Sequence, residues 1–148
     1  MEELIKTLLV KAQHDGVEKL VVGGVICMEN KVLLLRRCPD EYLSGLVELP
    51  SGKVDQGEEL LQALAREIKE ETNLELIAVE SYIGSFDYHS GSGKKSRQFN
   101  FKIKTDGNIK INPEEHDEYG FYSVNEINGS SLNISEFTKK IILQSMPA

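Results

Sequence analysis

Apolar residues recur along the chain with two different periods, and these periods predict where helices and strands lie. Spacings of three and four residues predict helices over Glu2–Gln13, Gly57–Thr72 and Ser135–Met146, the last of them capped by Ser135. Runs rich in Val, Leu, Ile and Phe predict strands over Lys19–Met28, Lys31–Arg37, Leu46–Leu49, Leu74–Tyr88, Arg97–Lys104 and Gly120–Val124. Polar or glycine-rich stretches predict loops or turns over Pro39–Gly45, His89–Ser96, Thr105–Asn108 and Glu114–Glu118.

The order of these elements predicts the fold class. Two polar residues, Glu29 and Asn30, join the first two strands, which indicates a β-hairpin. Strands and helices then alternate without regular βαβ units, so we expect an α/β fold in which a mixed β-sheet carries helices on both faces. The 148 residues suit a single domain, and no repeat or low-complexity tract divides the chain.

Composition and charge narrow the classes of function. The chain is 40% apolar and 28% charged, which is typical of a globular protein, and no apolar run is long enough to span a bilayer. Acidic Glu2 and Glu3 stand where a secretory signal carries positive charge, so we expect a cytoplasmic protein without a membrane partner. The net charge of −7 argues against binding to a nucleic acid polymer, but not against a small phosphorylated substrate held through metal cations. The two cysteines, Cys27 and Cys38, lack metal-ligand spacing and are expected to be free thiols.

Three glutamates crowd one side of the predicted central helix. At about 100° per residue, Glu67, Glu70 and Glu71 fall on one narrow arc beside the apolar face. Their mutual repulsion would destabilise a bare helix, and a hard divalent cation would remove it, since such cations prefer carboxylate oxygens. The competing interpretation is a solvated acidic face with salt bridges to Arg66 or Lys69.

The residues before the helix favour the metal interpretation. Gly52 and Gly57 allow a tight loop that folds back over the helix and aims a backbone carbonyl at the same cation. Read together, the segment has Gly52, five residues, Glu58, seven residues, and then Arg66-Glu-Ile-Lys-Glu-Glu-Thr-Asn-Leu74. This segment, 52–74, resembles the Nudix box, and flanking similarity extends the resemblance over roughly residues 19–128. Two positions differ, because Ser51 and Asn73 stand where the family usually has glycine; Asn tolerates the left-handed conformation expected there.

The resemblance implies an α/β/α sandwich and hydrolysis of a nucleoside diphosphate linked to another group. By that resemblance, Glu67 and Glu71 hold Mg²⁺, with Mn²⁺ as a substitute, and Glu70 is a further ligand or the general base. The backbone oxygen of Ser51 remains available as a ligand, Arg66 orients Glu67, and Glu58 anchors the loop. The family often adds an acid from outside the box; the candidates are Glu114, Glu115, His116, Asp117 and Glu118. Glu115 and Glu118 are favoured as that acid, and His116 is a candidate base.

Several residues are candidates for holding the substrate. Arg37 stands where MutT-like enzymes use arginine for phosphate, and Lys53 adds a positive charge near the box. Lys94, Lys95 and Arg97 flank a Gly/Ser loop, where closure over phosphates and plain solvation are both open. Phe86, Tyr88 and Phe99 are candidates for stacking on a base, although alternation places some of them in the core.

The substrate and the activity stay open within this family. A nucleoside triphosphate or a nucleotide-sugar type compound is expected. A ligand-sensing domain or a prenyl-diphosphate isomerase on the same fold is the alternative. The intact glutamate triad disfavours a sensor, and the short chain without an additional catalytic Cys motif disfavours an isomerase. The sequence leaves the oligomeric state open, a homodimer included.

Overall fold

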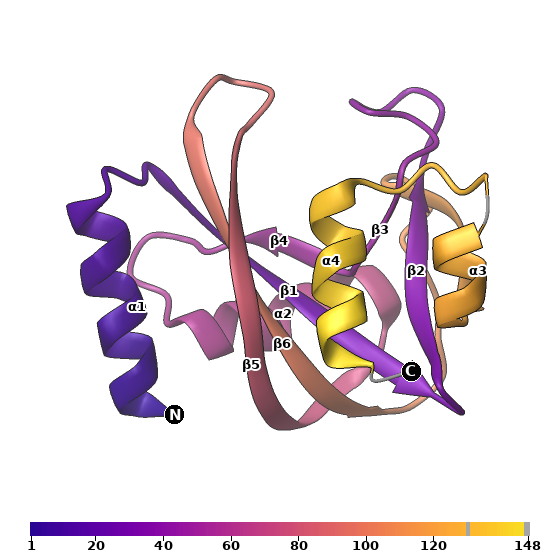
Figure 1. The fold of residues 1–148 in the computed structure, drawn as a ribbon, viewed down its shortest axis with the longest axis horizontal. Helices are drawn as coiled ribbons and strands as arrows, with labels where there is room; N and C mark the ends of the chain where they lie inside the picture. The colour runs from indigo at the N-terminus through magenta and orange to yellow at the C-terminus, as the bar shows by residue number, and fades with distance from the viewer. Residues whose placement is uncertain (130, 147–148) are drawn as a thin grey trace.

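The computed structural model describes residues 1–129 and 131–146. Figure 1 shows its elements, whose order along the chain is α1 (Glu2–His14), β1 (Lys19–Met28), β2 (Lys31–Arg37), β3 (Val47–Glu48), β4 (Ser51–Lys53), α2 (Leu60–Thr72), β5 (Glu75–His89), β6 (Lys95–Asp106), β7 (His116–Tyr122), α3 (Val124–Gly129) and α4 (Glu136–Ser145). Among the described residues, no helix has the length and apolar character needed to span a membrane.

The strands form one mixed sheet. Its main path runs β3-β2-β1-β6-β5, while β4 pairs with β1 and β7 pairs with β2. The central β1 and β6 are parallel, and the other strand pairs are antiparallel. The expected mixed sheet is therefore confirmed.

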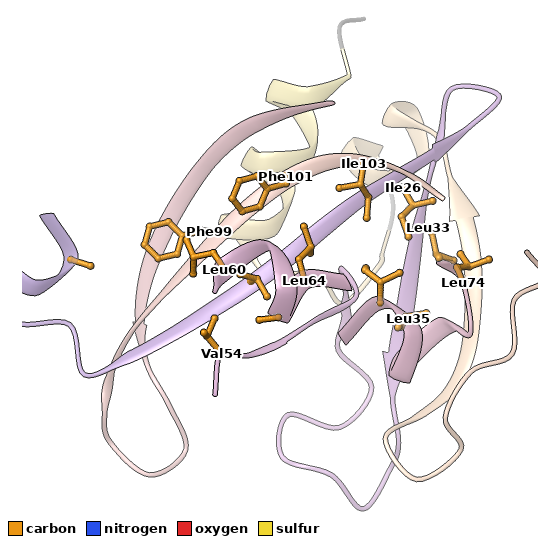
Figure 2. Close-up of a cluster of buried hydrophobic side chains, with 14 residues drawn as sticks. Ile26, Leu33, Leu35, Val54, Leu60, Leu64, Leu74, Phe99, Phe101 and Ile103 are labelled. Atoms are coloured by element: carbon orange, nitrogen blue, oxygen red, sulfur yellow. The ribbon is translucent and has the colours of Figure 1, made fainter. Parts of the chain in front are cut away.

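Helices cover both faces of the sheet, as the apolar patterns predicted. On one face, α2 packs Leu60 and Leu64 against Phe99 and Phe101 of β6 (Figure 2). Ile68 of α2 belongs to the same cluster. The other face carries a second cluster, to which α3 contributes Ile127, α4 contributes Ile141 and Ile142, and Met146 follows directly after α4. Side chains such as Phe99 and Ile68 are at most 1% exposed, so each contributes about 2 kcal/mol through burial.

Local sequence signals placed several elements correctly. The bounds of β1 and β2 are those predicted, and the hairpin between them is confirmed. Glu29 and Asn30 both adopt positive φ, at 51° and 63°, which is the conformation of a type I′ turn. Ser135 caps α4 by accepting a hydrogen bond from the Thr138 amide at 3.1 Å. Asn73 ends α2 in the left-handed region, as expected for a residue standing in place of glycine.

Other predicted bounds were wrong. Helix α2 begins at Leu60 rather than Gly57, because Gly57 turns the chain at φ +80° and Glu59 forms a capping box with Gln62. Strand β7 begins at His116 rather than Gly120, so part of the predicted acidic loop is paired with β2. Strand β6 begins at Lys95 rather than Arg97 and ends at Asp106 rather than Lys104, because β1 and β5 pair with its ends.

Two short elements were not predicted. Strand β4 consists of three residues that pair with β1, and nothing local to Ser51–Lys53 distinguishes it from a loop. Helix α3 had a usable signal, since Ser123 and Glu126 exchange hydrogen bonds with each other's backbone amides as in a capping box. Cys27 and Cys38 are free, as expected.

Candidate active site

A cavity of about 580 Å³ lies where α2, β3, β4 and the start of β7 meet. Nine of the residues that the sequence analysis named as candidates for the site line it: Arg37, Ser51, Lys53, Glu67, Glu71, Phe86, Tyr88, Glu115 and His116. Glu70 and Arg66 lie just outside, on the solvent side of α2, and contact each other at 3.3 Å. The structure thus brings most of the predicted site residues to one place.

Strand β4 fixes the carboxylates of α2. The Ser51 amide donates a hydrogen bond to Glu71 Oε1 at 2.8 Å. Ser51 has no positive φ, so replacing the usual glycine does not strain this strand. A Cβ built on Gly52 would overlap the Glu67 carboxyl group, so the absence of a side chain at this motif position makes room for that carboxylate.

This close approach gives a testable prediction. Gly52→Ala is expected to displace the Glu67 carboxylate and to lower turnover about 10²-fold, since misplacing a catalytic group by about 1 Å has that effect. The fold should persist, because the added methyl meets a flexible side chain rather than the core.

The measurement is steady-state hydrolysis of a diphosphate substrate, with thermal unfolding recorded alongside. Gly129→Ala is the matched control, because a Cβ there meets no atom of the described residues within 4 Å and its φ is not positive. Wild-type turnover in Gly52→Ala would contradict a role for the position of Glu67.

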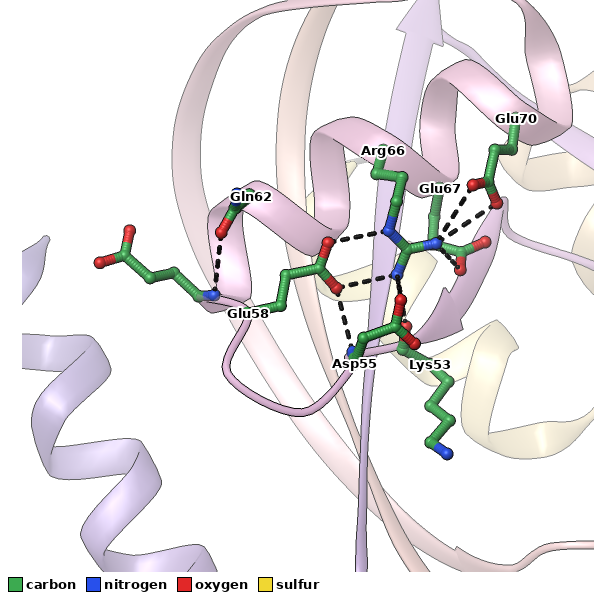
Figure 3. A network of polar contacts seen from close by, with 8 residues as sticks. Lys53, Asp55, Glu58, Gln62, Arg66, Glu67 and Glu70 are labelled. Carbon is green, nitrogen blue, oxygen red and sulfur yellow. Dashed lines mark hydrogen bonds and ion pairs between the residues drawn. The ribbon is translucent and has the colours of Figure 1, made fainter.

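Arg66 joins the glutamates to the loop before the helix (Figure 3). Its guanidinium donates to both oxygens of Glu58 at 2.8 and 2.9 Å, to Glu67 at 2.8 Å and to the Lys53 carbonyl at 2.9 Å. The hydrogen bonds from Arg66 hold the pKa of Glu58 at about 2. Glu58 also accepts from the Asp55 amide, so it anchors the loop as the resemblance implied. This contact between Arg66 and Glu67 fits the expected orienting role.

Glu71 is a carboxylate in an unfavourable environment. It is 5% exposed, and burial raises its pKa to about 10, although the Ser51 amide works in the opposite direction. The negative charges of Glu48, Glu115 and Glu67 contribute to this raised pKa. Burial also raises the pKa of Glu67. Buried carboxylates such as these are ionised only beside a positive charge, and a bound cation supplies one. Carboxylate oxygens are also the ligands that hard divalent cations prefer. The residues therefore fit a divalent metal.

A second wall of the cavity combines two candidates named from the sequence, Glu115 and His116, with Glu48, which was not predicted. Glu48 of β3 accepts from Arg37 at 3.0 Å and bonds to His116 Nε2 at 2.8 Å. A ring nitrogen of His116 and a carboxylate oxygen of each of Glu71 and Glu115 all lie within 4.8 Å of one another. Glu118, the other favoured acid, instead pairs with Arg36 at 3.0 Å. No motif pointed to Glu48, because its role depends on β2 pairing with both β3 and β7.

Aromatic and apolar side chains form the mouth of the cavity. Phe86 and Phe137 are stacked, with ring centroids 5.3 Å apart and an interplanar angle of 14°. Tyr42 and Phe137 are exposed, and they line the cavity together with Tyr88. Phe99, in contrast, is a core residue at 1% exposure and does not reach the cavity.

Lys95 and Arg97 lie elsewhere. Arg97 binds both oxygens of Asp87 at 2.7 and 2.8 Å and reaches Asp15, after α1, at 3.0 Å. Lys95 donates to the Asp15 carbonyl at 2.7 Å. Side chains alternate along β6, so these two face α1, whereas Gln98, on the opposite face, lines the cavity. The structure therefore does not bring this predicted pair of phosphate ligands to the site.

Arg97→Gln tests this placement. The variant is expected to lower the melting temperature by about 3 °C, because it leaves Asp87 without its bidentate partner. KM should stay within about twofold of wild type, because nothing at the cavity changes. Thermal unfolding and steady-state kinetics measure the two effects, and Lys104→Gln, at an exposed position of the same strand away from the cavity, is the control. A tenfold rise in KM would contradict this placement and would indicate that Arg97 contacts the substrate.

Comparisons with known proteins agree with this geometry. A family model described as NUDIX domain matches residues 17–144. An RNA pyrophosphohydrolase of Campylobacter jejuni is 30% identical over 130 residues, covering 79% of this chain and 81% of the relative. An ADP-ribose pyrophosphatase of Methanocaldococcus jannaschii is 40% identical over 67 residues, which cover 45% and 38% of the two chains. The crystal structure of the MutT protein from Methanosarcina mazei Go1 aligns with a TM-score of 0.75 at 26% identity, covering 86% of this chain and 92% of that one. The chain therefore belongs to the NUDIX family and is a Nudix hydrolase that acts on pyrophosphate bonds.

Proposed function

We propose that this protein is a Mg²⁺-dependent pyrophosphohydrolase that cleaves a diphosphate linkage in a small nucleotide, either a nucleoside triphosphate or a nucleotide-sugar type compound. The observation that carries the proposal is the buried carboxylate of Glu71, which shares one cavity with Glu67 and Glu115. Three carboxylates facing a cavity of nucleotide size serve no evident purpose in a sensor that binds an anion. They suit a reaction in which an anionic diphosphate meets an anionic nucleophile.

Each residue then has a task that its position supports. A bound divalent cation supplies neutralisation of the phosphate oxygens and a lower pKa of the attacking water. Glu67 and Glu71 hold the cation, with the Ser51 carbonyl and Glu115 as further ligands. Arg66 orients Glu67 and favours its ionised form through a charge-assisted hydrogen bond of 2.8 Å, which opposes the effect of burial on the pKa of Glu67.

The remaining site residues serve the nucleophile and the substrate. Glu70 is 55% exposed and acts as a further ligand or as the base that removes a proton from water. Arg37 and Lys53 contact the phosphates from two sides of the cavity. Arg37 is already held by Glu48 and by the Tyr42 carbonyl, at 3.0 and 2.6 Å, so it presents its charge in a fixed direction. Tyr88 packs against the nucleoside.

The chemistry of the substrate is the finer part of the proposal. The names of the relatives from C. jejuni and M. jannaschii both join a pyrophosphate activity to a nucleotide-containing compound, RNA in one case and ADP-ribose in the other. The net charge of −7 favours a small nucleotide over an RNA chain, since a polymer brings many phosphates that need positive partners.

A substrate panel tests the function. The purified chain is assayed with Mg²⁺, with Mn²⁺ and with a chelator. The panel contains the nucleoside and deoxynucleoside triphosphates, ADP-ribose, a UDP-sugar, an RNA oligomer with a 5′-triphosphate, and isopentenyl diphosphate. Phosphate, pyrophosphate and nucleotide products are measured by chromatography.

The expected result is metal-dependent cleavage of one class of small nucleotide. Cleavage confined to the RNA oligomer would move the substrate to a polymer. Isomerisation of isopentenyl diphosphate without any hydrolysis would replace the proposed activity.

A further inference from the structure

His116 stands out among the residues of the second wall. It is 1% exposed, begins β7 beside the Glu115 turn, and lines the cavity. One of its ring nitrogens lies within 4.8 Å of carboxylate oxygens of both Glu71 and Glu115. The roles proposed above leave this imidazole without a task.

The two ring nitrogens of His116 have different surroundings. Nε2 lies 2.8 Å from Glu48 Oε2, and the same oxygen accepts from Arg37 at 3.0 Å. A carboxylate oxygen already receiving an arginine proton is an acceptor, so the bond assigns the ring hydrogen to Nε2. In the neutral imidazole, the lone pair then lies on Nδ1.

Nδ1 of His116 is buried, and among the described residues it has no hydrogen-bond partner. Leaving such an atom unsatisfied is unfavourable, and native proteins rarely retain one without a reason. The arrangement matches that of a metal-ligating histidine, whose other ring nitrogen usually donates to a carboxylate that fixes the tautomer and the orientation of the ring. Here Glu48 is that carboxylate, and Arg37 holds Glu48.

We propose that His116 Nδ1, Glu71 and Glu115 form a mixed nitrogen and oxygen site for a divalent transition-metal ion, with Glu48 as the positioning residue of the histidine. Carboxylate and carbonyl oxygens suit both Mg²⁺ and Mn²⁺, whereas an imidazole nitrogen suits transition metals rather than Mg²⁺, so an added histidine ligand is expected to favour Mn²⁺ over Mg²⁺. This set shares Glu71 and Glu115 with the all-oxygen Mg²⁺ ligands proposed above and differs from them by the nitrogen of His116. The inference rests on the proposed function only in placing a divalent cation beside Glu71.

Pulsed electron paramagnetic resonance on the Mn²⁺-loaded full-length chain tests the nitrogen ligand directly. The chain has three histidines, so the double variant His14→Gln/His89→Gln leaves His116 as the only one; His89 also lines the cavity, which makes it the necessary control. Imidazole nitrogen coupling to Mn²⁺ is expected in the wild type and in the double variant. Labelling histidine with ¹⁵N should change the coupling pattern in both, and His116→Gln should abolish it.

A second readout uses Glu48 and does not depend on His116→Gln folding. Glu48→Gln weakens the support of the histidine and is expected to lower Mn²⁺ affinity about tenfold. Mg²⁺ affinity should change less than twofold, because the all-oxygen ligands are intact. Titration calorimetry with each metal alone gives the loss of affinity for Mn²⁺ relative to that for Mg²⁺. Equal losses of affinity for the two metals would mean that Glu48 has only a structural role. That result would overturn the proposed preference of the His116 site for Mn²⁺.

The outcomes separate this inference from the proposed function. Mn²⁺ binding without histidine coupling, together with nucleotide hydrolysis, overturns the nitrogen ligand alone. Histidine coupling in a chain that hydrolyses no compound of the panel supports the ligand and overturns the proposed substrate class. A wild-type chain that binds no Mn²⁺ overturns the nitrogen site, whatever the hydrolysis assay gives.

Discussion

Glu71→Gln is expected to lower diphosphate hydrolysis about 10³-fold, equivalent to about 4 kcal/mol of transition-state stabilisation, while making the metal-free protein more stable. Glutamine has nearly the same shape, and its carbonyl oxygen can still accept from the Ser51 amide. Glutamine lacks the negative charge of the carboxylate, so it binds a divalent cation more weakly. It also lacks the charge that burial disfavours, so the same substitution acts in opposite directions on activity and on stability.

The sign of the stability effect follows from the pKa of Glu71. Its value is about 10 in the folded chain against 4.5 for the free residue, so the folded state binds the extra proton between these limits. The contribution of Glu71 to stability is therefore complete below about pH 4.5 and is lost as the pH rises toward 10. Glu71→Gln does not titrate, and its advantage over the metal-free wild type should grow from pH 5 to pH 9.

Two experiments check this prediction. Thermal unfolding with a chelator at pH 8 should show the variant more stable by about 2 kcal/mol, or ~6 °C. Added Mg²⁺ or Mn²⁺ should raise the melting temperature of the wild type more than that of the variant. Glu80→Gln, an exposed substitution on β5, is the control for both measurements. Activity within tenfold of wild type would remove Glu71 from the assigned chemistry.

Arg66→Gln is the second substitution with a large expected effect. Hydrolysis should fall about 10²-fold, because Glu67 loses the 2.8 Å contact that fixes its carboxylate. The melting temperature should fall by about 5 °C, because the partly buried Glu58 loses its bidentate partner. Lys69→Gln, one turn further along α2 and half exposed, is the matched control and should change both quantities little.

The stability loss of Arg66→Gln should also depend on pH. Pairing with Arg66 lowers the pKa of Glu58 from 4.5 to about 2, so the stability from this pair is present above about pH 4.5 and is lost as the pH falls toward 2. Urea unfolding of variant and wild type should therefore differ most at neutral pH and converge near pH 2.5. A difference that stays constant with pH would mean that Arg66 stabilises the loop through its Lys53 carbonyl contact instead.

Sequence alone was sufficient where the cause of a structure is local. The apolar runs of β1 and β2 and the polar turn between them are set by neighbouring residues, and their bounds were predicted correctly. The spacing of Glu67 and Glu71 along one helix likewise placed both carboxylates at the cavity. These features follow from periods of two and 3.6 residues, which can be read without knowledge of the fold.

Sequence was insufficient where distant segments have to meet. Glu48 and His116 are 68 positions apart, and they contact only because β3 and β7 flank β2. Arg97 looked like part of a basic cluster beside a loop, whereas strand alternation turns it toward α1. Lysine and arginine beside a loop look the same in sequence whether they bind a substrate or an acidic side chain of the protein. Only the structure, which shows partners such as Asp87, distinguishes the two roles.

The cavity is built from two parts with separate supports. The ionic floor belongs to α2 and β4, whose backbone positions are fixed by the core and by Gly52. The aromatic mouth comes from the loop carrying Tyr42, from β5 and from α4. Residues of the mouth can therefore change during evolution without disturbing the groups that break the bond. Such a scaffold can acquire new substrates through substitutions in the aromatic mouth while the residues that perform the chemistry stay the same. The mouth is therefore the part of the cavity at which to redesign substrate specificity.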